Sequence, residues 1–454
     1  MIKVFFWGIS PEEQKQKKRK KEIDSTEDGR AEMKYFALGL FVLMYIMMIA
    51  FPKKRIWFVL GSALIFIVSG IVPIAEAPSA INWNVLMMIA GTMVVVYYFI
   101  ESGMPDLIAD MLLDKAKNVA WVTIYMSLFA GLVSAFIDNV ATVLMIAPVA
   151  LAICRKMKIS PVPMIISISV SSNLQGAATL VGDTTSILLG DYAKMDFLDF
   201  FFMNGRPGIF FAVELGAIAT VPVMLYIFRR DRQPVFSEKR TEISSVVPTV
   251  FLLGIVVTLI CASFIPGKPD ETNGFICMAF ATVSMVWNYL ATGKLANAKE
   301  AVRSLDLETI LLLTGLFIAI DGITRAGVID DAASLIVAAG GNNLFLLYTI
   351  IVWGSVLISA FVDNIPYVAT MLPVLAGVTK MLGIEPYLLY FGLLTGATLG
   401  GNLTPIGASA NITAVGLLKK EGYEVSFTDF FRIGGTFTLT AVLVGYLYIW
   451  FVWK

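Results

Sequence analysis

Two short motifs place a carboxylate and an amide inside otherwise apolar sequence. Residues 134–139 read SAFIDN and residues 359–364 read SAFVDN. Both contain an Asp-Asn pair, and the two pairs lie 225 positions apart: Asp138-Asn139 and Asp363-Asn364. An ionised carboxylate at the centre of a bilayer costs about 3 kcal/mol or more. Because this cost recurs at two matched positions, the motifs predict that both aspartates bind an ion and release it.

A glycine-rich polar segment follows each motif. NLQGAATLVGDTTS occupies residues 173–186, and GGNLTPIGASAN occupies residues 400–411. Glycine, threonine and proline inside apolar sequence favour an unwound stretch between two half-helices, whose free carbonyls can coordinate cations and whose following helix N-terminus attracts an anion. The motifs and segments together give the predicted substrate- and ion-binding residues: Asp138, Asn139, Thr142, Asn173, Thr179, Gly182, Asp183, Ser186, Asp363, Asn364, Asn402, Thr404, Gly407, Ser409 and Asn411.

The two glycine-rich segments differ at positions that would line a shared site. Asp183 of the first aligns with Ala408 of the second. Three further pairs also differ: Ser186 and Asn411, Ala177 and Asn402, Thr142 and Tyr367. A symmetric scaffold with an asymmetric lining is expected if one substrate binds between two halves. Asp183 is therefore either a third carboxylate for a proton or cation, or the N-cap of a helix over residues 184–190.

The composition is that of a membrane protein. Of 454 residues, 57% are hydrophobic and 15% are charged, which is too apolar for one soluble core. Several uncharged stretches are long enough to cross a bilayer as helices, such as residues 35–51, 56–75, 85–100, 274–292 and 437–453. We predict an all-α polytopic protein of the plasma membrane, with the lipid bilayer as its surroundings.

Composition also excludes several classes of function. The net charge is zero, so nothing indicates a nucleic-acid partner. The three cysteines follow no metal or disulfide spacing, and the chain has no histidine. A His-based metal site is therefore excluded, and any proton transfer must use carboxylates, Lys, Tyr or water. We predict no cofactor and no bound metal other than Na⁺ as a transported or coupling ion. The residues that could bind Na⁺ are those of the two Asp-Asn pairs: Asp138, Asn139, Asp363 and Asn364.

The sequence divides into two halves of similar plan. Asn82, Gly91 and Gly103 match Asp306, Gly315 and Gly327 at a spacing of 224, while Thr179 and Gly182 match Thr404 and Gly407 at 225. Ordered matches at a near-constant offset indicate an internal duplication. The predicted organisation is a basic N-terminal tail (1–33), repeat 1 (34–228, tip 138–139), a cytoplasmic linker (229–243) and repeat 2 (244–454, tip 363–364).

Each Asp-Asn pair is predicted to lie at the tip of a re-entrant hairpin. The limb over residues 140–153 is about 21 Å of helix, against a hydrocarbon core of about 30 Å. Two full spans joined by a polar turn are the alternative. With five further crossings and one unwound helix in each half, the loops rich in Lys and Arg fall on one side, and the two repeats are inverted. This arrangement puts both termini outside, whereas the basic run of the N-terminal tail favours the cytoplasm, so the side of the N-terminus stays open.

Two acids outside the motifs also lie in apolar sequence. Glu214 is six residues into a predicted span without a local partner, so it is either functional or a polar contact between helices. Asp321 precedes Arg325 by one helical turn, which predicts a structural ion pair.

The motifs resemble those of the ion transporter (ArsB/NhaD) superfamily. SAFVDNIPYVATMLPV (359–374) and GATLGGNLTPIGASANITAVG (396–416) are similar to the arsenite permease and P-protein branch, and residues 134–149 and 176–190 resemble the first-half motifs of the same families. The superfamily also contains NhaD-type sodium/proton antiporters and citrate–metal symporters. The resemblance covers roughly residues 34–454. It implies inverted repeats that converge on a midplane site, and a homodimer that works by an elevator motion.

The resemblance also shows where this chain departs from the family pattern. Related divalent-anion/sodium symporters bind sodium at Ser-Asn-Thr tips, where this chain has Asp138-Asn139-Val140 and Asp363-Asn364-Ile365. Relatives usually have Pro-Pro-Asn after the first Gly-Asp, whereas this chain has Thr184-Thr185-Ser186. The first departure favours aspartates that can be protonated.

These observations predict a secondary active transporter and not an enzyme. Asp138, Asp363 and Asp183 would carry the coupling proton or sodium ion. The predicted substrate is arsenite or another inorganic or organic anion, and sodium/proton antiport is the alternative. Two other classes remain open: a passive channel, and an intramembrane hydrolase that uses the two motif aspartates as a dyad.

Overall fold

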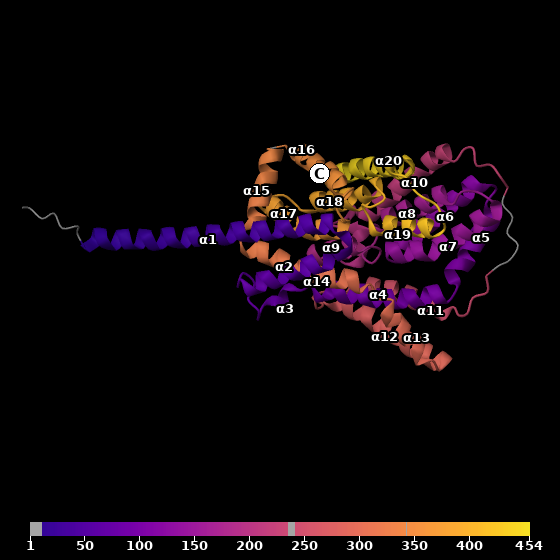
Figure 1. Ribbon diagram of the computed structural model, residues 1–454, viewed down its shortest axis with the longest axis horizontal. Helices are drawn as coiled ribbons and strands as arrows, with labels where there is room; N and C mark the ends of the chain where they lie inside the picture. The colour runs from indigo at the N-terminus through magenta and orange to yellow at the C-terminus, as the bar shows by residue number, and fades with distance from the viewer. Residues whose placement is uncertain (1–10, 235–240, 342) are drawn as a thin grey trace, which may run out of the picture. The chain divides into compact units, whose positions relative to one another are not determined.

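The computed structural model describes residues 11–234, 241–341 and 343–454, most of which are helical (Figure 1). The chain forms two compact units. Unit 1 takes its residues from Met1–Ile81 and Thr314–Ala332, and unit 2 from Asn82–Leu313 and Ala333–Lys454. All the predicted site residues lie in unit 2.

Unit 1 is built on a long first helix, α1 (Pro11–Ala50), followed by η1 (Pro52–Lys54), α2 (Arg55–Val68) and α3 (Ala77–Ala80). Part of α14 (Leu307–Arg325) and the start of α15 (Val328–Gly340) complete it. A Cβ on Gly315 would lie 2.9 Å from Val59, and one on Gly322 would lie 2.5 Å from Phe66. These glycines therefore let α14 approach α2 closely, as small residues do between membrane helices.

The predicted N-terminal tail is only partly described. Residues 1–10 lie outside the described residues, and residues 11–33 are helical and continuous with the first span in α1. The predicted pair of Asp321 and Arg325 is confirmed, with 2.6 Å between Oδ2 and Nε, and Arg325 also contacts Glu76 at 2.7 Å. These contacts belong to unit 1 and not to the predicted site.

Unit 2 contains the first-half helices that carry the site. They are α4 (Trp83–Glu101), α5 (Met104–Lys115), α6 (Val119–Ser134), α7 (Asn139–Met157), α8 (Val162–Gly176), α9 (Thr184–Tyr192) and α10 (Ile209–Ile227). Between α9 and α10 lie η2 (Phe197–Phe200) and a short antiparallel pair of strands, β1 (Phe202–Met203) and β2 (Arg206–Pro207).

The rest of unit 2 begins with α11 (Val247–Ser263), α12 (Thr272–Thr292) and α13 (Leu295–Arg303). The second-half helices follow α15: α16 (Leu344–Ser359), α17 (Asn364–Leu382), α18 (Tyr387–Gly400), η3 (Gly401–Leu403), α19 (Ser409–Lys420) and α20 (Phe427–Trp453). In chain order, α4 to α10 correspond to α14 to α20.

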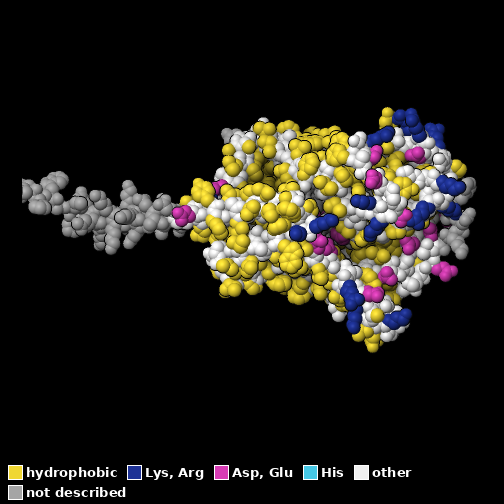
Figure 2. Space-filling model, in the orientation of Figure 1, with side chains coloured by type: hydrophobic (Ala, Val, Ile, Leu, Met, Phe, Trp, Pro, Cys, Tyr) yellow, Lys and Arg dark blue, Asp and Glu magenta, His cyan; other side chains and the backbone are white. Residues whose placement is uncertain are grey.

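The prediction of an all-α polytopic membrane protein is confirmed. Among the described residues, eight helices are long and apolar enough to cross a membrane: residues 31–50 of α1, then α4, α7, α10, α12, α14, α17 and α20. The bent pair α15 and α16 also passes this test, and α6 and α11 are shorter apolar helices. Figure 2 shows wide hydrophobic surfaces, with Lys and Arg gathered toward one end of unit 2.

Matched local geometry supports the internal duplication. The side chain of Asn118 accepts a hydrogen bond from the Trp121 amide at 3.1 Å, and that of Asn343 accepts one from the Leu346 amide at 3.1 Å, 225 positions later. Gly103 and Gly327 both have a positive φ, 74° and 76°. The inverted orientation of the two repeats stays a prediction.

Two helix boundaries differ from the sequence-based expectation. The predicted span over residues 56–75 ends as a helix at Val68, because the chain turns at Gly70 with a φ of 76°. The limb predicted to end at residue 153 continues to Met157, since α7 has 19 residues with Pro148 inside it. The last turn carries Arg155 and Lys156, whose charges suit a helix C-terminus. The re-entrant hairpin stays a prediction.

Candidate functional site

Both Asp-Asn motifs lie at a break between two helices, and each aspartate caps the second helix. Asp138 Oδ2 accepts hydrogen bonds from the amides of Val140 at 2.9 Å and Ala141 at 3.2 Å. Asp363 Oδ1 accepts one from the amide of Ile365 at 3.1 Å. An aspartate at the N-cap satisfies amides that the helix leaves unpaired, and the helix dipole favours its charge. The motif therefore both ends the first helix and starts the second.

Each glycine-rich segment is unwound between two helices, as predicted. The first lies between α8 and α9, and the second lies between η3 and α19. Thr179 Oγ1 donates a hydrogen bond to the carbonyl of Ala135, and Thr404 Oγ1 donates one to that of Ala360 at 2.5 Å. The two bonds are equivalent under the 225-residue offset. They tie each unwound segment to the tip of the preceding Asp-Asn motif.

Gly182 and Gly407 allow this close approach of backbones. A Cβ on Gly182 would lie 2.6–2.7 Å from the carbonyl oxygens of Gly176, Ala135 and Ser134. A Cβ on Gly407 would lie 2.6–2.9 Å from three carbonyl oxygens at the equivalent positions. Real Cβ atoms do not approach backbone oxygens this closely, so both positions require glycine.

A network of buried asparagine amides connects the two halves. Asn139 Nδ2 donates to Asn173 Oδ1 at 3.0 Å, and Asn173 Nδ2 donates to Asn402 Oδ1 at 3.1 Å. Asn411 Nδ2 donates to the same Asn402 oxygen at 3.4 Å. All four side chains are at least 95% buried. The first Asp-Asn motif is thereby linked through α8 and η3 to α19.

Five hydroxyl residues that sequence reasoning missed join this network. Ser134 Oγ donates to Asn139 Oδ1 at 2.7 Å, and Ser169 Oγ donates to Asn411 Oδ1. The complete set of missed residues is Ser134, Ser169, Ser172, Thr185 and Thr398. A signal was available for part of it, because the stretch SISVSSN at 167–173 places several serines in an apolar helix.

Asp183 is buried between the halves rather than serving as a simple side-chain cap. It occupies the N-cap position of α9, but its carboxylate accepts a hydrogen bond from Thr185 Oγ1 at 2.8 Å and from no backbone amide. The same Thr185 oxygen lies 3.0 Å from Thr398 Oγ1 of α18. Asp183 is also within electrostatic range of Asp138 and Asp363. Three carboxylates therefore converge where the unwound segments meet the motif tips.

The charge of the first half is not balanced by a cation of the protein. Across the described parts of the chain, neither Asp138 nor Asp183 forms an ion pair with a Lys or Arg. In the second half, Asp363 Oδ2 accepts a hydrogen bond from Ser409 Oγ at 3.2 Å. The first half is thus the more electronegative side of the site.

The two motif asparagines differ in their bonding. Asn139 is held by Ser134 and Asn173, as described above. Asn364 is 96% buried, yet its amide has no hydrogen-bond partner among the residues that the structure describes. Its half has Thr398 where the first half has Asn173, and Ser359, the counterpart of Ser134, donates to the carbonyl of Ala397 instead. The Asn364 amide is therefore available to a ligand.

A cavity of about 250 Å³ reaches Asp138 from outside the motif. It is lined by α4, by the first turns of α7 and by the residues just before α14. Asp306 is a second carboxylate in its wall, and the hydroxyl of Tyr97, also in the wall, donates to Glu300 Oε2 at 3.4 Å. Among its described lining residues there is no Lys or Arg. The cavity therefore offers a cation a route to Asp138.

Two predicted site residues contact only backbone near the network. Thr142 Oγ1 donates weakly to the carbonyl of Ile137 at 3.5 Å, and Ser186 Oγ donates to that of Gly176 at 3.4 Å. Glu214 lies apart from the network in α10. Its Oε1 is buried without a hydrogen-bond partner in the described residues, so that oxygen makes no polar contact between helices.

Residues 43–396 match the profile of the family described as citrate transporter. The chain belongs to the citrate transporter family. The matched range contains both Asp-Asn motifs and the first unwound segment, and it ends before the second.

Relatives of this citrate transporter family member include bacterial and mammalian proteins. An uncharacterized transporter of Mycobacterium tuberculosis is 28% identical, with 92% of this chain and 98% of the relative covered. The human P protein is 24% identical, with 81% of this chain and 53% of the relative covered. The resemblance to the P-protein branch of the ion transporter superfamily is confirmed.

Two solved structures share the fold. The YdaH transporter of Alcanivorax borkumensis has a TM-score of 0.55 at 12% identity, with 92% of this chain and 97% of the other covered. MtrF of Neisseria gonorrhoeae, described as one of a class of antimetabolite efflux pumps, has a TM-score of 0.53 at 13% identity, with 90% and 84% covered. The citrate transporter family member is therefore an integral membrane protein with a transporter fold.

Proposed function

We propose that this protein is a secondary active transporter that moves a small anion or uncharged oxyacid together with protons. The observation that carries the proposal is that Asp138, Asp183 and Asp363 lie at helix breaks, the first two without an ion pair to any Lys or Arg that the structure describes. Membership of the citrate transporter family supports the general part of this proposal, that the protein is a membrane transporter.

Electrostatics links the binding of cation and substrate. A proton or another cation that binds among the three carboxylates would lower the net negative charge of the site. An anion that approaches the same site meets three negative charges until this neutralisation has occurred. Cation and anion binding are therefore mutually favourable, and such a coupling free energy between two ligands is reciprocal.

The two halves supply different groups for the two ligands. Asp183 stands at the N-cap of α9, whereas Ala408, at the N-cap of α19, has no carboxylate. The N-cap position of α19 therefore carries no negative charge, at a helix end whose dipole favours an anion. The free amide of Asn364 adds a donor in the same half. We assign the coupling proton to Asp138 and Asp183, and the substrate to the side of Asn364 and Ser409.

Sodium/proton antiport is the second candidate function, because the cavity at Asp138 favours cations. Asp306 adds a carboxylate to its wall. Sodium would then be held by Asp138 and Asn139, and in the second half by Asp363 and Asn364. Under the first proposal, arsenite, antimonite and small carboxylates are the substrates to screen. The homodimer and its elevator motion remain a proposal drawn from the superfamily.

Proton flux in proteoliposomes tests both candidates. The vesicles contain a trapped pH-sensitive dye and receive sodium, lithium, arsenite, antimonite or citrate as a pulse. Proton uptake with an anion or oxyacid that is lost in Asp138→Asn supports the proposal. Proton release after sodium that is lost in the same variant indicates the antiporter.

Asp429→Asn is the matched control, because Asp429 is an exposed aspartate in the first turn of α20, away from the site. Its flux should equal that of the unmodified protein. Substrate flux without proton movement, unchanged in Asp138→Asn and Asp363→Asn, contradicts coupling through these groups and indicates a channel.

A further inference from the structure

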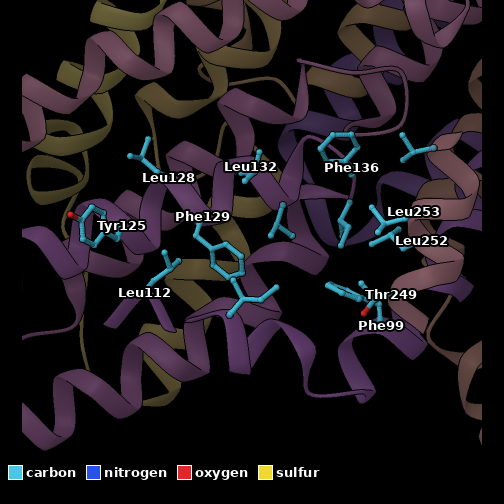
Figure 3. Close-up of a pocket in the computed structure, with 14 residues that line it drawn as sticks. Phe99, Leu112, Tyr125, Leu128, Phe129, Leu132, Phe136, Thr249, Leu252 and Leu253 are labelled. Atoms are coloured by element: carbon cyan, nitrogen blue, oxygen red, sulfur yellow. The ribbon is translucent and has the colours of Figure 1, made fainter. Parts of the chain in front are cut away.

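An apolar groove of about 560 Å³ lies in unit 2 beside the first Asp-Asn motif (Figure 3). Its lining follows one face of α6, at positions 125, 128, 129, 132 and 133, and continues to Phe136 and Ile137. Positions 108 and 112 of α5 and positions 249, 252, 253 and 256 of α11 form two further faces. The spacings of three and four residues are those of helix faces directed into one space.

The groove opens to the outside of the protein and ends beside the motif. Leu132 and Leu253 are 58% and 59% exposed, whereas Ile137, which adjoins Asp138, is 2% exposed. The apolar helices α6 and α11 supply these exposed leucines. Because the protein is embedded in a bilayer, hydrocarbon chains are the medium that meets such a surface. An occupant can therefore enter sideways from the lipid.

The two ends of the groove differ in character. Figure 3 shows Tyr125 and Leu112 at one end, and Phe99, Thr249, Leu252 and Leu253 at the other. Lys115 lies on α5 nearly one turn beyond Leu112 and is exposed. Tyrosine and lysine side chains are both typical of the membrane–water interface. The Tyr125 end is therefore the interfacial end of the groove.

A cluster of basic residues surrounds the interfacial end. The amides of Val119 and Ala120, at the start of α6, donate to the carbonyls of Gln233 and Asp231 at 3.1 and 3.0 Å. These bonds hold the segment after α10 against the start of α6. The exposed basic residues between the end of α5 and the start of α6, and in the segment after α10, are Lys115, Lys117, Arg229, Arg230 and Arg232. They outnumber the acids Asp114 and Asp231, so this end attracts an anionic group.

We propose that the groove binds an acyl chain of an anionic phospholipid. The headgroup lies at the basic cluster, and the chain extends along α6 to Phe136 and Ile137. The volume lies within the range of about 300–1,000 Å³ that small-molecule sites occupy. Lipid chains in the bilayer are as apolar as the groove, so the charge of the headgroup determines which lipid is preferred. This inference does not depend on the coupling ion or the substrate proposed above.

Photolabelling of the full chain in vesicles tests the proposal. The vesicles consist of phosphatidylethanolamine with a small fraction of phosphatidylglycerol that carries a diazirine in one acyl chain. After illumination, labelled peptides are mapped by mass spectrometry. We expect adducts on α6 near Leu132 and on α11 near Leu253. Labelling by phosphatidylcholine with the same diazirine should be lower by about fivefold, the factor that one basic residue supplies at an anionic surface.

Two variants separate the groove from ordinary lipid contact. Leu132→Trp places an indole at the rim and should abolish labelling of α11. Ile218→Trp is its matched control, because Ile218 is an exposed apolar residue of α10, at 63%, that does not line the groove. It should leave the labelling unchanged. Lys115→Gln with Lys117→Gln should remove the preference for phosphatidylglycerol while phosphatidylcholine labelling stays constant.

Two results would overturn the proposal. One is equal labelling of the groove and of the α10 surface, with no effect of Leu132→Trp. The other is efficient disulfide formation between copies of a Leu132→Cys variant, which would show that a second copy of the chain covers the groove. Neither readout requires transport, so the proposed function and this inference can fail independently.

Discussion

Replacing Asn173 with alanine should destabilise the protein, because its side chain joins the two halves of the asparagine network. Asn173 Nδ2 donates to the carbonyl of Thr398 at 2.7 Å and to Asn402 Oδ1 at 3.1 Å, and its Oδ1 accepts from Asn139 Nδ2 at 3.0 Å. The substitution removes three hydrogen bonds at once. It leaves buried polar groups of three partners with fewer bonds, because no water reaches a side chain that is 99% buried.

The expected loss of stability follows from the number of hydrogen bonds that the substitution removes. Hydrogen bonds between membrane helices contribute about 0.6 kcal/mol on average and up to about 1.7 kcal/mol, and an unsatisfied buried group costs about 1–3 kcal/mol. Three bonds with some relaxation of the partners give a loss of about 2–4 kcal/mol in the free energy of unfolding. A double-mutant cycle with Asn402→Ala should show a coupling energy of about 1 kcal/mol across the two halves.

Reversible unfolding in mixed detergent, followed by tryptophan fluorescence, measures this free energy. Ser171→Ala is the matched control, because Ser171 lies on the same helix and its buried hydroxyl has no hydrogen-bond partner within the described residues. Its removal should be neutral or stabilising. The reasoning is refuted if Asn173→Ala and Ser171→Ala have the same stability, or if the cycle shows no coupling between Asn173 and Asn402.

Further predictions address a glycine and an isolated acid. Gly182→Ala should prevent folding or reduce the yield of monodisperse protein in size-exclusion chromatography, because three carbonyl oxygens occupy the space of the new methyl group; Gly416→Ala, where no atom lies within 4 Å, should behave normally. Glu214→Gln should raise the free energy of unfolding at neutral pH by about 1 kcal/mol, because it replaces a buried carboxylate oxygen without a partner; unchanged or lower stability in the same unfolding assay would contradict this.

The sequence alone predicted the features that depend on interactions between residues close together in the chain. An Asp-Asn pair inside an apolar run predicts a helix break, because the carboxylate can satisfy the first amides of a new helix, as Asp138 does for Val140 and Ala141. The glycine-rich segments predict unwinding for a similar reason: a Cβ at Gly182 has no room.

The cross-links between halves could not be predicted in the same way. Asn173 and Asn402 are 229 positions apart, and their contact depends on how α8 packs near η3. No local pattern encodes that packing. The compact units also differ from the repeats, since Gly315 and Gly322 let α14 pack on α2, which precedes the first repeated helix.

The capping role of Asp138 gives protonation a mechanical effect. Its Oδ2 holds the amides of Val140 and Ala141, so a proton bound to this carboxylate weakens its pull on the first turn of α7. Binding of a proton would therefore change the charge of the site and the order of this helix end at the same time. In the second half, Asp363 Oδ1 accepts a hydrogen bond from the Ile365 amide at the equivalent position. Under the proposed function, each Asp-Asn motif thus joins a charged side chain to the first turn of the helix that follows it.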